Sequence, residues 1–263
     1  MAALLSRKFE SARAAYRAND VEAARAAHIH ASQEAHSQGQ HLKSVVYGGL
    51  DGIITTFAVV AGVAGASLDA TIVLILGFAN LIADGLSMAI GDFLSTKAEL
   101  QLAATEQARE SWEVEHFPDQ ERAELVDVYQ AKGMPEADAV EMVAILSRHK
   151  KAWIDTMMAA ELGIPETDES PVGNAVATFL SFVVFGFVPL VAYVLSRLVT
   201  LGISPLLLAV MLTAVMLFVL GTVKVRVVRM HWVRAGSEML LVGGVAAVAA
   251  YGIGAALRAI VGS

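Results

Sequence analysis

The sequence predicts an all-α membrane protein with five transmembrane helices and a helical insert in the cytosol. Hydrophobic residues make up 56% of the 263 residues and charged residues 17%, whereas a soluble domain carries about 45–50% and about 25%. The apolar residues gather in five long stretches, and Lys and Arg are distributed unevenly between the segments that join them. A water-soluble single domain is therefore not expected.

The composition also narrows the chemistry. The chain has no cysteine, which excludes a disulfide-stapled scaffold, a thiolate nucleophile and Cys-ligated zinc or iron–sulfur sites. Its net charge of −7 argues against a nucleic-acid partner, because phosphate binding needs a basic surface.

Each apolar stretch is about 20 residues long, the length of helix that crosses a bilayer core. The stretches cover residues 45–66, 70–92, 174–196, 204–223 and 238–258. A short turn at 65–69 joins the first two, so we expect a tight helical hairpin. Residues 1–43 are polar and helix-prone and show no cleavable signal peptide.

The positions of Lys and Arg orient the chain. With the N-terminus inside, 17 of the 19 bases lie on the cytosolic side and only Arg197 and Arg258 lie outside. Positive charge is enriched in cytosolic loops, so we expect a cytosolic N-terminus and a C-terminus on the opposite side. The absence of a targeting segment and the compact termini favour a bacterial inner membrane over an organelle membrane.

A soluble insert separates the second span from the third. The expected parts of the chain are an N-terminal segment 1–43, spans one and two at 44–92, the insert at 93–170, and spans three to five at 171–263. The insert holds 17 of the 26 acidic residues against seven bases. We expect its first helix to continue the second span as far as His116, where Pro118 interrupts it, since proline cannot donate the helical N–H bond.

Polar residues recur inside the first two spans. Asp51 lies in span one, and Asn80, Asp84, Met88 and Asp92 follow every four residues in span two, which places them along one helix stripe. Intramembrane carboxylates are costly and usually face a partner or a water-filled path. A thioether beside carboxylates suits Fe²⁺ better than Ca²⁺ or Mg²⁺. The alternative is that Met88 fills space and Asp92 is interfacial.

The insert carries acidic residues at helical spacing. Two glutamates at i and i+3 share one helix face, and the break at Pro118 lets two such faces fold toward each other. The pairs are Glu110 with Glu113 and Glu121 with Glu124, and farther on Met157 and Met158 precede Glu161. The alternative is a solvated acidic face, which the excess of acids and the adjacent methionines disfavour.

These motifs resemble those of the vacuolar iron transporter family, which includes the yeast vacuolar iron and manganese carrier and nodulin-like relatives. The resemblance runs from about residue 43 to the end. It rests on Leu50-Asp51-Gly52-Ile53-Ile54, Leu86-Ser87-Met88-Ala89, Phe117-Pro118-Asp119 and Met157-Met158-Ala159-Ala160-Glu161-Leu162-Gly163. It implies a five-helix protomer in a homodimer, a cytosolic helical domain that binds divalent metal, and exchange of Fe²⁺ for protons.

The resemblance also implies two sets of metal ligands. Asp51 and Met88 match the ligands of the membrane path. The residues that match the cytosolic ligands are Glu110, Glu113, Glu121, Glu124, Met157, Met158 and Glu161. The family's plant transporter has a glutamate where this chain has Asn80, and an amide cannot titrate near neutral pH. We therefore predict that Asp84, one turn away, shares proton coupling with Asp51.

The N-terminal segment lies outside this resemblance. It contains His28, His30, His36 and His41. His30, Glu34 and His41 would share one face of an unbroken helix, a spacing that can bind metal. A polar helix with solvated histidines is the preferred explanation, because Gly39 weakens a continuous face.

We predict a transporter that moves a divalent metal out of the cytosol in exchange for protons, with Fe²⁺ as the first candidate and Mn²⁺ as the second. No prosthetic group and no enzymatic activity are expected. A membrane-anchored metal sensor or buffer is the alternative, and it leaves Asp51, Asp84 and Met88 unexplained. A di-iron carboxylate oxidase needs a Glu-x-x-His from each of two helices, and only Glu113 with His116 has this spacing among the acidic residues of interest. A ligand set of carboxylates and thioethers does not indicate which of Fe²⁺, Mn²⁺, Co²⁺ and Zn²⁺ the protein prefers.

Overall fold

The computed structural model describes residues 16–18, 20–200, 202–224 and 231–261, with the backbone alone for 24–42, 223–224 and 261. Over these residues the chain is helical and contains no strand. Five of the described helices are long and apolar enough to cross a membrane. The prediction of an all-α polytopic membrane protein is confirmed.

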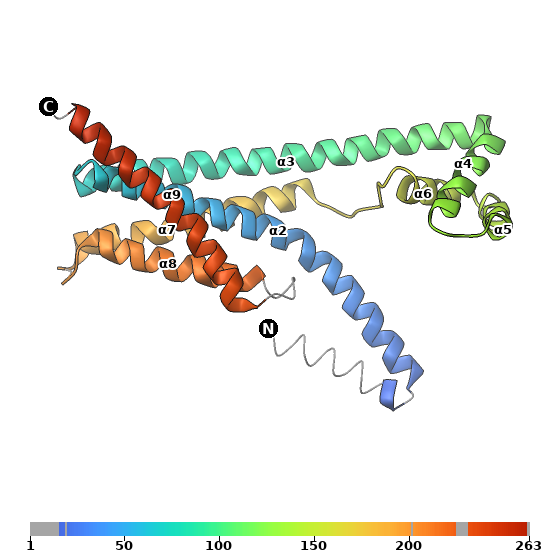
Figure 1. Cartoon of the computed structure of the whole chain (residues 1–263), viewed down its shortest axis with the longest axis horizontal. Helices are drawn as coiled ribbons and strands as arrows, with labels where there is room; N and C mark the ends of the chain where they lie inside the picture. The colour runs from blue at the N-terminus through green and yellow to red at the C-terminus, as the bar shows by residue number, and fades with distance from the viewer. Residues whose placement is uncertain (1–15, 19, 201, 225–230, 262–263) are drawn as a thin grey trace. The chain divides into compact units, whose positions relative to one another are not determined.

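The chain divides into two compact units, Met1–Phe93 with Val172–Ser263 and Leu94–Pro171. The first unit holds the membrane-spanning helices (Figure 1). They are α2 (Val21–Gly65), the first part of α3 (Ala70–His116), α7 (Pro171–Leu198), α8 (Pro205–Lys224) and α9 (Trp232–Val261).

Helices α2 and α3 are longer than the apolar stretches from which they were predicted. The side chain of Asp20 caps α2 by accepting a hydrogen bond from the backbone N–H of Ala23 at 3.0 Å, as N-cap residues do. The 47 residues of α3 measure about 70 Å at about 1.5 Å per residue, more than twice a bilayer core of about 30 Å. The charged residues beyond Asp92 therefore lie outside the membrane-spanning segment.

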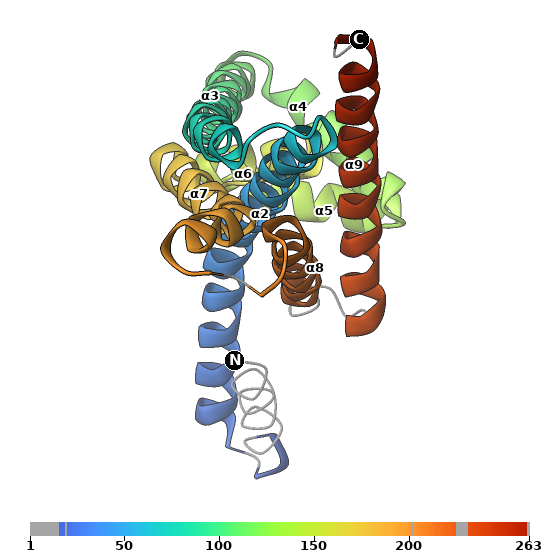
Figure 2. The same cartoon turned by 90° about the vertical axis from the view of Figure 1, so that its left-hand side faces the viewer.

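Close helix contacts hold the first unit together, with α2 in the middle of the group (Figure 2). A Cβ atom on Gly52 of α2 would come within 2.4 Å of the carbonyl oxygen of Phe182 on α7, and one on Gly65 within 2.3 Å of that of Tyr251 on α9. Small residues allow such approaches where lipid gives no hydrophobic drive between helices. The glycines thus fix the distance between α2 and its neighbours.

The second unit consists of the last part of α3 with three short helices beside it (Figure 1). These are α4 (Pro118–Ala131), α5 (Glu136–Leu146) and α6 (Lys150–Ala160). Pro118 marks the boundary between α3 and α4. It is the first residue of α4, where the N–H group that proline lacks would have no helical partner in any case. The unit packs around fully buried Leu125 and Met157 with Trp153.

The sequence interpretation favours solvated N-terminal histidines, with a metal-binding face of His30, Glu34 and His41 as the alternative. The side chains of these residues, and those of His28 and His36, lie outside the described part of the chain. The backbone of this segment belongs to α2, which runs without interruption from Val21 into the first span.

Candidate metal centre

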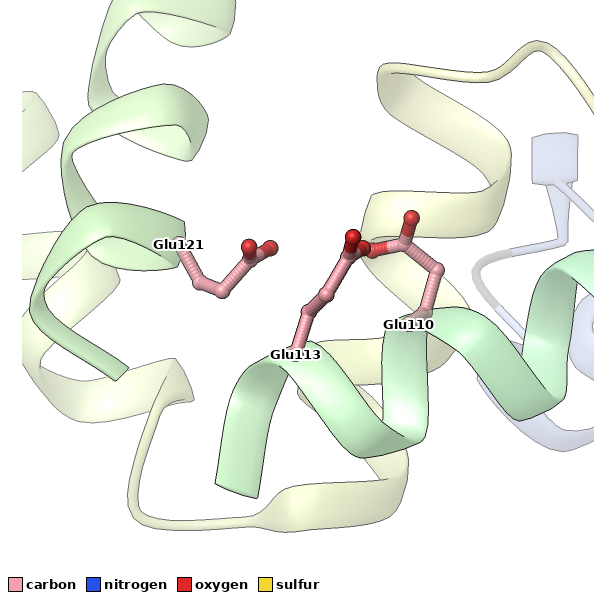
Figure 3. Close-up of side chains that lie close together, drawn as sticks. All are labelled: Glu110, Glu113 and Glu121. Carbon is pink, nitrogen blue, oxygen red and sulfur yellow. The ribbon is translucent and has the colours of Figure 1, made fainter. Parts of the chain in front are cut away.

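Three glutamates of the second unit point toward one another (Figure 3). Glu110 and Glu113 lie one turn apart on α3, and Glu121 lies in the first turn of α4. One carboxylate oxygen from each lies within 4.8 Å of the other two. A divalent transition metal binds carboxylate oxygens at about 2.0–2.2 Å, so small side-chain adjustments let one ion contact all three. We call these three residues the glutamate cluster.

Two members of the glutamate cluster are buried. Glu110 is 2% exposed and Glu121 is 4% exposed, and the Oε2 atom of each has no hydrogen-bond partner within the described part of the chain. A buried carboxylate oxygen without a partner is costly unless the group holds a proton or contacts a cation. These two atoms therefore fit the binding of a cation.

Burial and crowding change the proton affinity of the cluster. Burial, followed by the charges of Glu161 and Glu113, raises the pKa of Glu110 to about 7. Burial, followed by the charge of Glu124, raises the pKa of Glu121 to about 7 as well. The pKa of Glu161 is also raised, by burial first and then by Glu124. Five carboxyl groups thus share one negative field, and a cation that binds near neutral pH displaces protons.

Arg109 supplies positive charge to the glutamate cluster. Its guanidinium nitrogens lie 2.8 Å from Glu106, 3.3 Å from Glu110 and 3.8 Å from Glu113. The sequence interpretation missed this residue, although the spacing of positions 106, 109 and 113 places all three on one helix face.

The other predicted ligands of the insert lie in different surroundings. Glu124 is half-buried and accepts a hydrogen bond from the side-chain amide of Gln120 at 2.9 Å. Met157 and Met158 are 0% and 7% exposed and pack in the hydrophobic core of the unit. The structure thus brings Glu110, Glu113 and Glu121 together, with Glu124 and Glu161 in electrostatic range, and places the methionines in the core.

The predicted path residues lie in the first unit. Asp51 on α2 and Asp84 and Met88 on α3 are all half-buried. Asp51 and Asp84 are close enough for their charges to interact, and Met88 packs against the apolar core. The side-chain nitrogen of Asn80 is buried and finds no hydrogen-bond partner among the described residues. The stripe on α3 therefore presents polar groups to the packed interior of the unit.

Asp92 has a larger structural role than the interfacial residue considered in the sequence interpretation. Its Oδ2 atom accepts hydrogen bonds from the hydroxyl groups of Ser44 on α2, at 3.1 Å, and Thr178 on α7. Both hydroxyl-bearing residues are buried. Asp92 thus joins three helices at the end of the apolar part of α3, a role that stripe spacing alone could not show.

Comparison with known proteins identifies the family. The family model described as the VIT family matches residues 42–255. The chain belongs to the VIT family. It is 36% identical to the vacuolar iron transporter of Toxoplasma gondii (98% of this chain, 91% of the relative) and 33% identical to that of Plasmodium falciparum (97% and 98%). It is 29% identical to vacuolar iron transporter 1 of Arabidopsis thaliana (84% and 88%).

The VIT-family match covers both the glutamate cluster and the polar stripe of α3. It confirms the family resemblance inferred from the sequence motifs. The VIT-family relatives named above are eukaryotic and carry the word vacuolar in their names, so they give no support to the expected bacterial inner membrane. An integral membrane location agrees with the five candidate spans.

Proposed function

We propose that this chain transports a divalent metal ion across a membrane, with Fe²⁺ as a substrate and Mn²⁺ as a further one. The observation that carries the proposal is the glutamate cluster, with carboxylate oxygens from three residues within 4.8 Å and two buried oxygens that lack hydrogen-bond partners in the described chain. Full-length relatives named vacuolar iron transporters support Fe²⁺. Carboxylate ligands accept Mn²⁺ readily.

The proposed route starts at the cytosolic insert and ends across the membrane. Glu110, Glu113 and Glu121 collect the ion. The remaining residues that family resemblance assigns to this step are Glu124, Met157, Met158 and Glu161. Asp51 and Met88 pass the ion through the membrane-spanning unit, where an intramembrane carboxylate needs a partner. The uneven distribution of bases supports a cytosolic insert and export of metal from the cytosol.

We include proton exchange in the proposal. Asp51 and Asp84 interact electrostatically within an apolar region, and two such carboxylates need a cation, either a metal ion or a proton. Arrival of the metal ion expels the proton, and arrival of the proton releases the metal ion. Asn80 cannot take up a proton, so Asp84 takes the role of the family glutamate.

A homodimer completes the proposed assembly and rests on the family resemblance. Exposed apolar side chains on α9, among them Leu241, Val245 and Val248 at 68%, 63% and 75% exposure, provide a face for lipid or for a second protomer. Such a face is expected in a helix surrounded by a bilayer, since lipid tails are as apolar as these side chains.

The geometry does not favour a di-iron oxidase. His116, which completes the Glu-x-x-His spacing with Glu113, pairs through Nδ1 with the backbone oxygen of Trp112 at 2.8 Å. Its ring stacks on the Trp112 ring at 4.4 Å between centroids. The Nδ1 contact leaves Nε2 free, but His116 is not part of the group of ligand atoms formed by Glu110, Glu113 and Glu121 among the described residues, and VIT-family proteins are transporters.

Uptake of Fe²⁺ by proteoliposomes under anaerobic conditions tests the proposal. Wild-type chain should load the vesicles, and Asp51→Asn should lower the initial rate to the level of protein-free vesicles, because the amide removes the charge that holds the ion within an apolar span. Asp69→Asn, at an exposed aspartate in the turn between α2 and α3, is the matched control and should keep most of the rate.

Two results would contradict the proposed function. Wild-type protein that binds Fe²⁺ without loading the vesicles would be a sensor or buffer. Normal uptake by the Asp51→Asn variant would remove Asp51 from the path.

A further inference from the structure

We propose that Arg109 is a built-in competitor of the metal ion at the glutamate cluster, which weakens metal binding and speeds release of the ion. The inference rests on the proposed function, because it takes the cluster to bind a divalent cation. It adds a residue outside the ligand set that sets how tightly the ion is held.

The contacts of Arg109 overlap with those that a metal ion needs. One terminal nitrogen lies 3.3 Å from Oε1 of Glu110 and the other lies 3.8 Å from Oε1 of Glu113. An oxygen paired with a guanidinium must be shared or released before it coordinates a metal ion. The fixed positive charge of arginine also repels a divalent cation held by the same carboxylates.

Arg109 has a third carboxylate partner, Glu106, which lies outside the glutamate cluster. Its Nε atom donates a hydrogen bond to Glu106 at 2.9 Å, and a terminal nitrogen lies 2.8 Å from the same Glu106 oxygen. The Arg109 side chain is 49% exposed, whereas that of Glu110 is 2% exposed. When an ion binds, the arginine can therefore move toward water while it stays paired with Glu106, and the buried glutamate keeps its position.

This arrangement favours transfer of the ion over storage. When the ion leaves, Arg109 returns to Glu110 and Glu113, so departure does not leave these carboxylates without a counter-ion. Stabilising the metal-free cluster in this way weakens affinity and accelerates dissociation. Because arginine stays protonated at every physiological pH, the competition does not depend on its own titration.

Metal titration of the full-length chain in detergent tests the proposal, with Co²⁺ as the probe and calorimetry at low salt as the readout. Arg109→Gln should bind Co²⁺ about five- to tenfold more tightly, a modest factor because the arginine is half-exposed and screened. Capture of Co²⁺ by excess chelator should show release slowed by a similar factor. Arg109→Lys, which keeps the charge but loses the planar fork, should lie between this variant and the wild type.

The matched control is Arg148→Gln, at an exposed arginine between α5 and α6. This substitution removes the same positive charge from the same unit and should leave the Co²⁺ affinity unchanged. Glu106→Gln should weaken Co²⁺ binding in the wild-type background, because Arg109 then loses its alternative partner. The same substitution should have little effect in the Arg109→Gln background.

The outcomes separate this inference from the proposed function. Wild-type affinity, or weaker binding, in a folded Arg109→Gln variant would overturn the role of Arg109, and so would an equal gain in the Arg148→Gln control. Equal weakening by Glu106→Gln in both backgrounds would contradict its action through Arg109. Failure of the wild-type chain to bind Co²⁺ would overturn the proposed function instead. Circular dichroism checks the fold of each variant.

Discussion

Glu110 and Glu121 differ from exposed carboxylates in their pKa and in their hydrogen bonding. Each has a pKa of about 7, raised mainly by burial, and each keeps one oxygen that lacks a hydrogen-bond partner within the described structure. A group with these properties exchanges a proton for a metal ion near neutral pH at little cost. The chemistry of the cluster therefore lies in the competition between protons, Arg109 and a divalent cation for the same oxygens.

Metal binding at pH 7 should release about one proton per ion, because two carboxyl groups with a pKa of about 7 are each about half protonated and must ionise to bind. Calorimetry of Co²⁺ binding in two buffers of different ionisation enthalpy measures this number. Glu121→Gln should reduce it, whereas Glu99→Gln, at an exposed glutamate of α3, should not. Binding without proton release would contradict the raised pKa values.

The same pKa values fix the sign of the pH dependence. Because the pKa of each glutamate is raised on folding, the folded chain binds more protons than the unfolded chain between pH 4.5 and about 7. The metal-free insert therefore loses stability as the pH rises through 7. Metal affinity has the opposite trend and weakens as the pH falls through 7, because protons compete for the ligands.

At the scale of elements, the contact between α2 and α7 positions Asp51. Gly52 follows Asp51 directly, and its backbone lies against Phe182 and Gly186 of α7. The polar end of the same bundle is fixed by Asp92, which accepts hydrogen bonds from α2 and α7. The contacts at Gly52 and at Asp92 thus hold the helices of the proposed path in fixed positions relative to one another.

Gly52→Ala should destabilise the chain by about 1–3 kcal/mol, the usual cost of overpacking. The added Cβ would lie 2.4 Å from the carbonyl oxygen of Phe182, and a backbone atom cannot rotate away as a side chain can. Thermal unfolding in detergent measures the effect. Gly244→Ala on α9, where a Cβ would meet no atom of the described chain within 4 Å, is the control and should melt at or slightly above the wild-type temperature, because alanine favours a helix over glycine. Equal melting of the two variants would contradict the packing account.

Much of the helix pattern could be predicted from the sequence, because length and hydropathy decide which segments span a bilayer. The proline at position 118 marks the boundary between α3 and α4, and the i, i+3 spacing of the glutamates indicates their shared faces. The sequence could not show that α2 starts at Val21, since a helix continues into water without an apolar pattern. Nor could it show that Met157 is fully buried, because burial depends on how α4, α5 and α6 pack.

The candidate metal centre could also be predicted in part from the sequence. Residue types and spacing identify Glu110, Glu113 and Glu121 as candidates for one site. The spacing on one helix indicates that Arg109 pairs with Glu106 and Glu113, although the sequence interpretation missed it. The joint between Asp92, Ser44 and Thr178 could not be predicted, because it depends on distances between three helices.

At the scale of the whole molecule, the proposed function assigns a different task to each of the two units. The unit Leu94–Pro171 gathers the carboxylates that fit a divalent ion, and the membrane-spanning unit holds Asp51 and Asp84. A protein that only stored or sensed metal would need the unit Leu94–Pro171 alone. The presence of both supports a path that takes an ion from the cytosol across the membrane.

The proposed function depends on coupling between metal and proton movement, and Asp84 is the residue to which this coupling is most specifically assigned. In proteoliposomes with the cytosolic face outward, Asp84→Asn should make Fe²⁺ uptake respond less to an imposed pH gradient, because the amide cannot carry the counter-moving proton. Asn80→Glu in the same chain should partly restore the response, since it returns a carboxylate one turn away on the same stripe. Unchanged pH dependence in the Asp84→Asn variant would assign the proton to Asp51 or to a cytosolic carboxylate.

The most direct measurement records internal iron and internal pH at the same time in vesicles that contain the wild-type chain. Exchange predicts that the internal pH rises as Fe²⁺ enters, because each ion that moves inward is accompanied by protons that move outward. An acidic interior should accelerate this entry. Entry of Fe²⁺ with a constant internal pH would contradict proton exchange, and binding of Fe²⁺ without any entry would contradict transport itself.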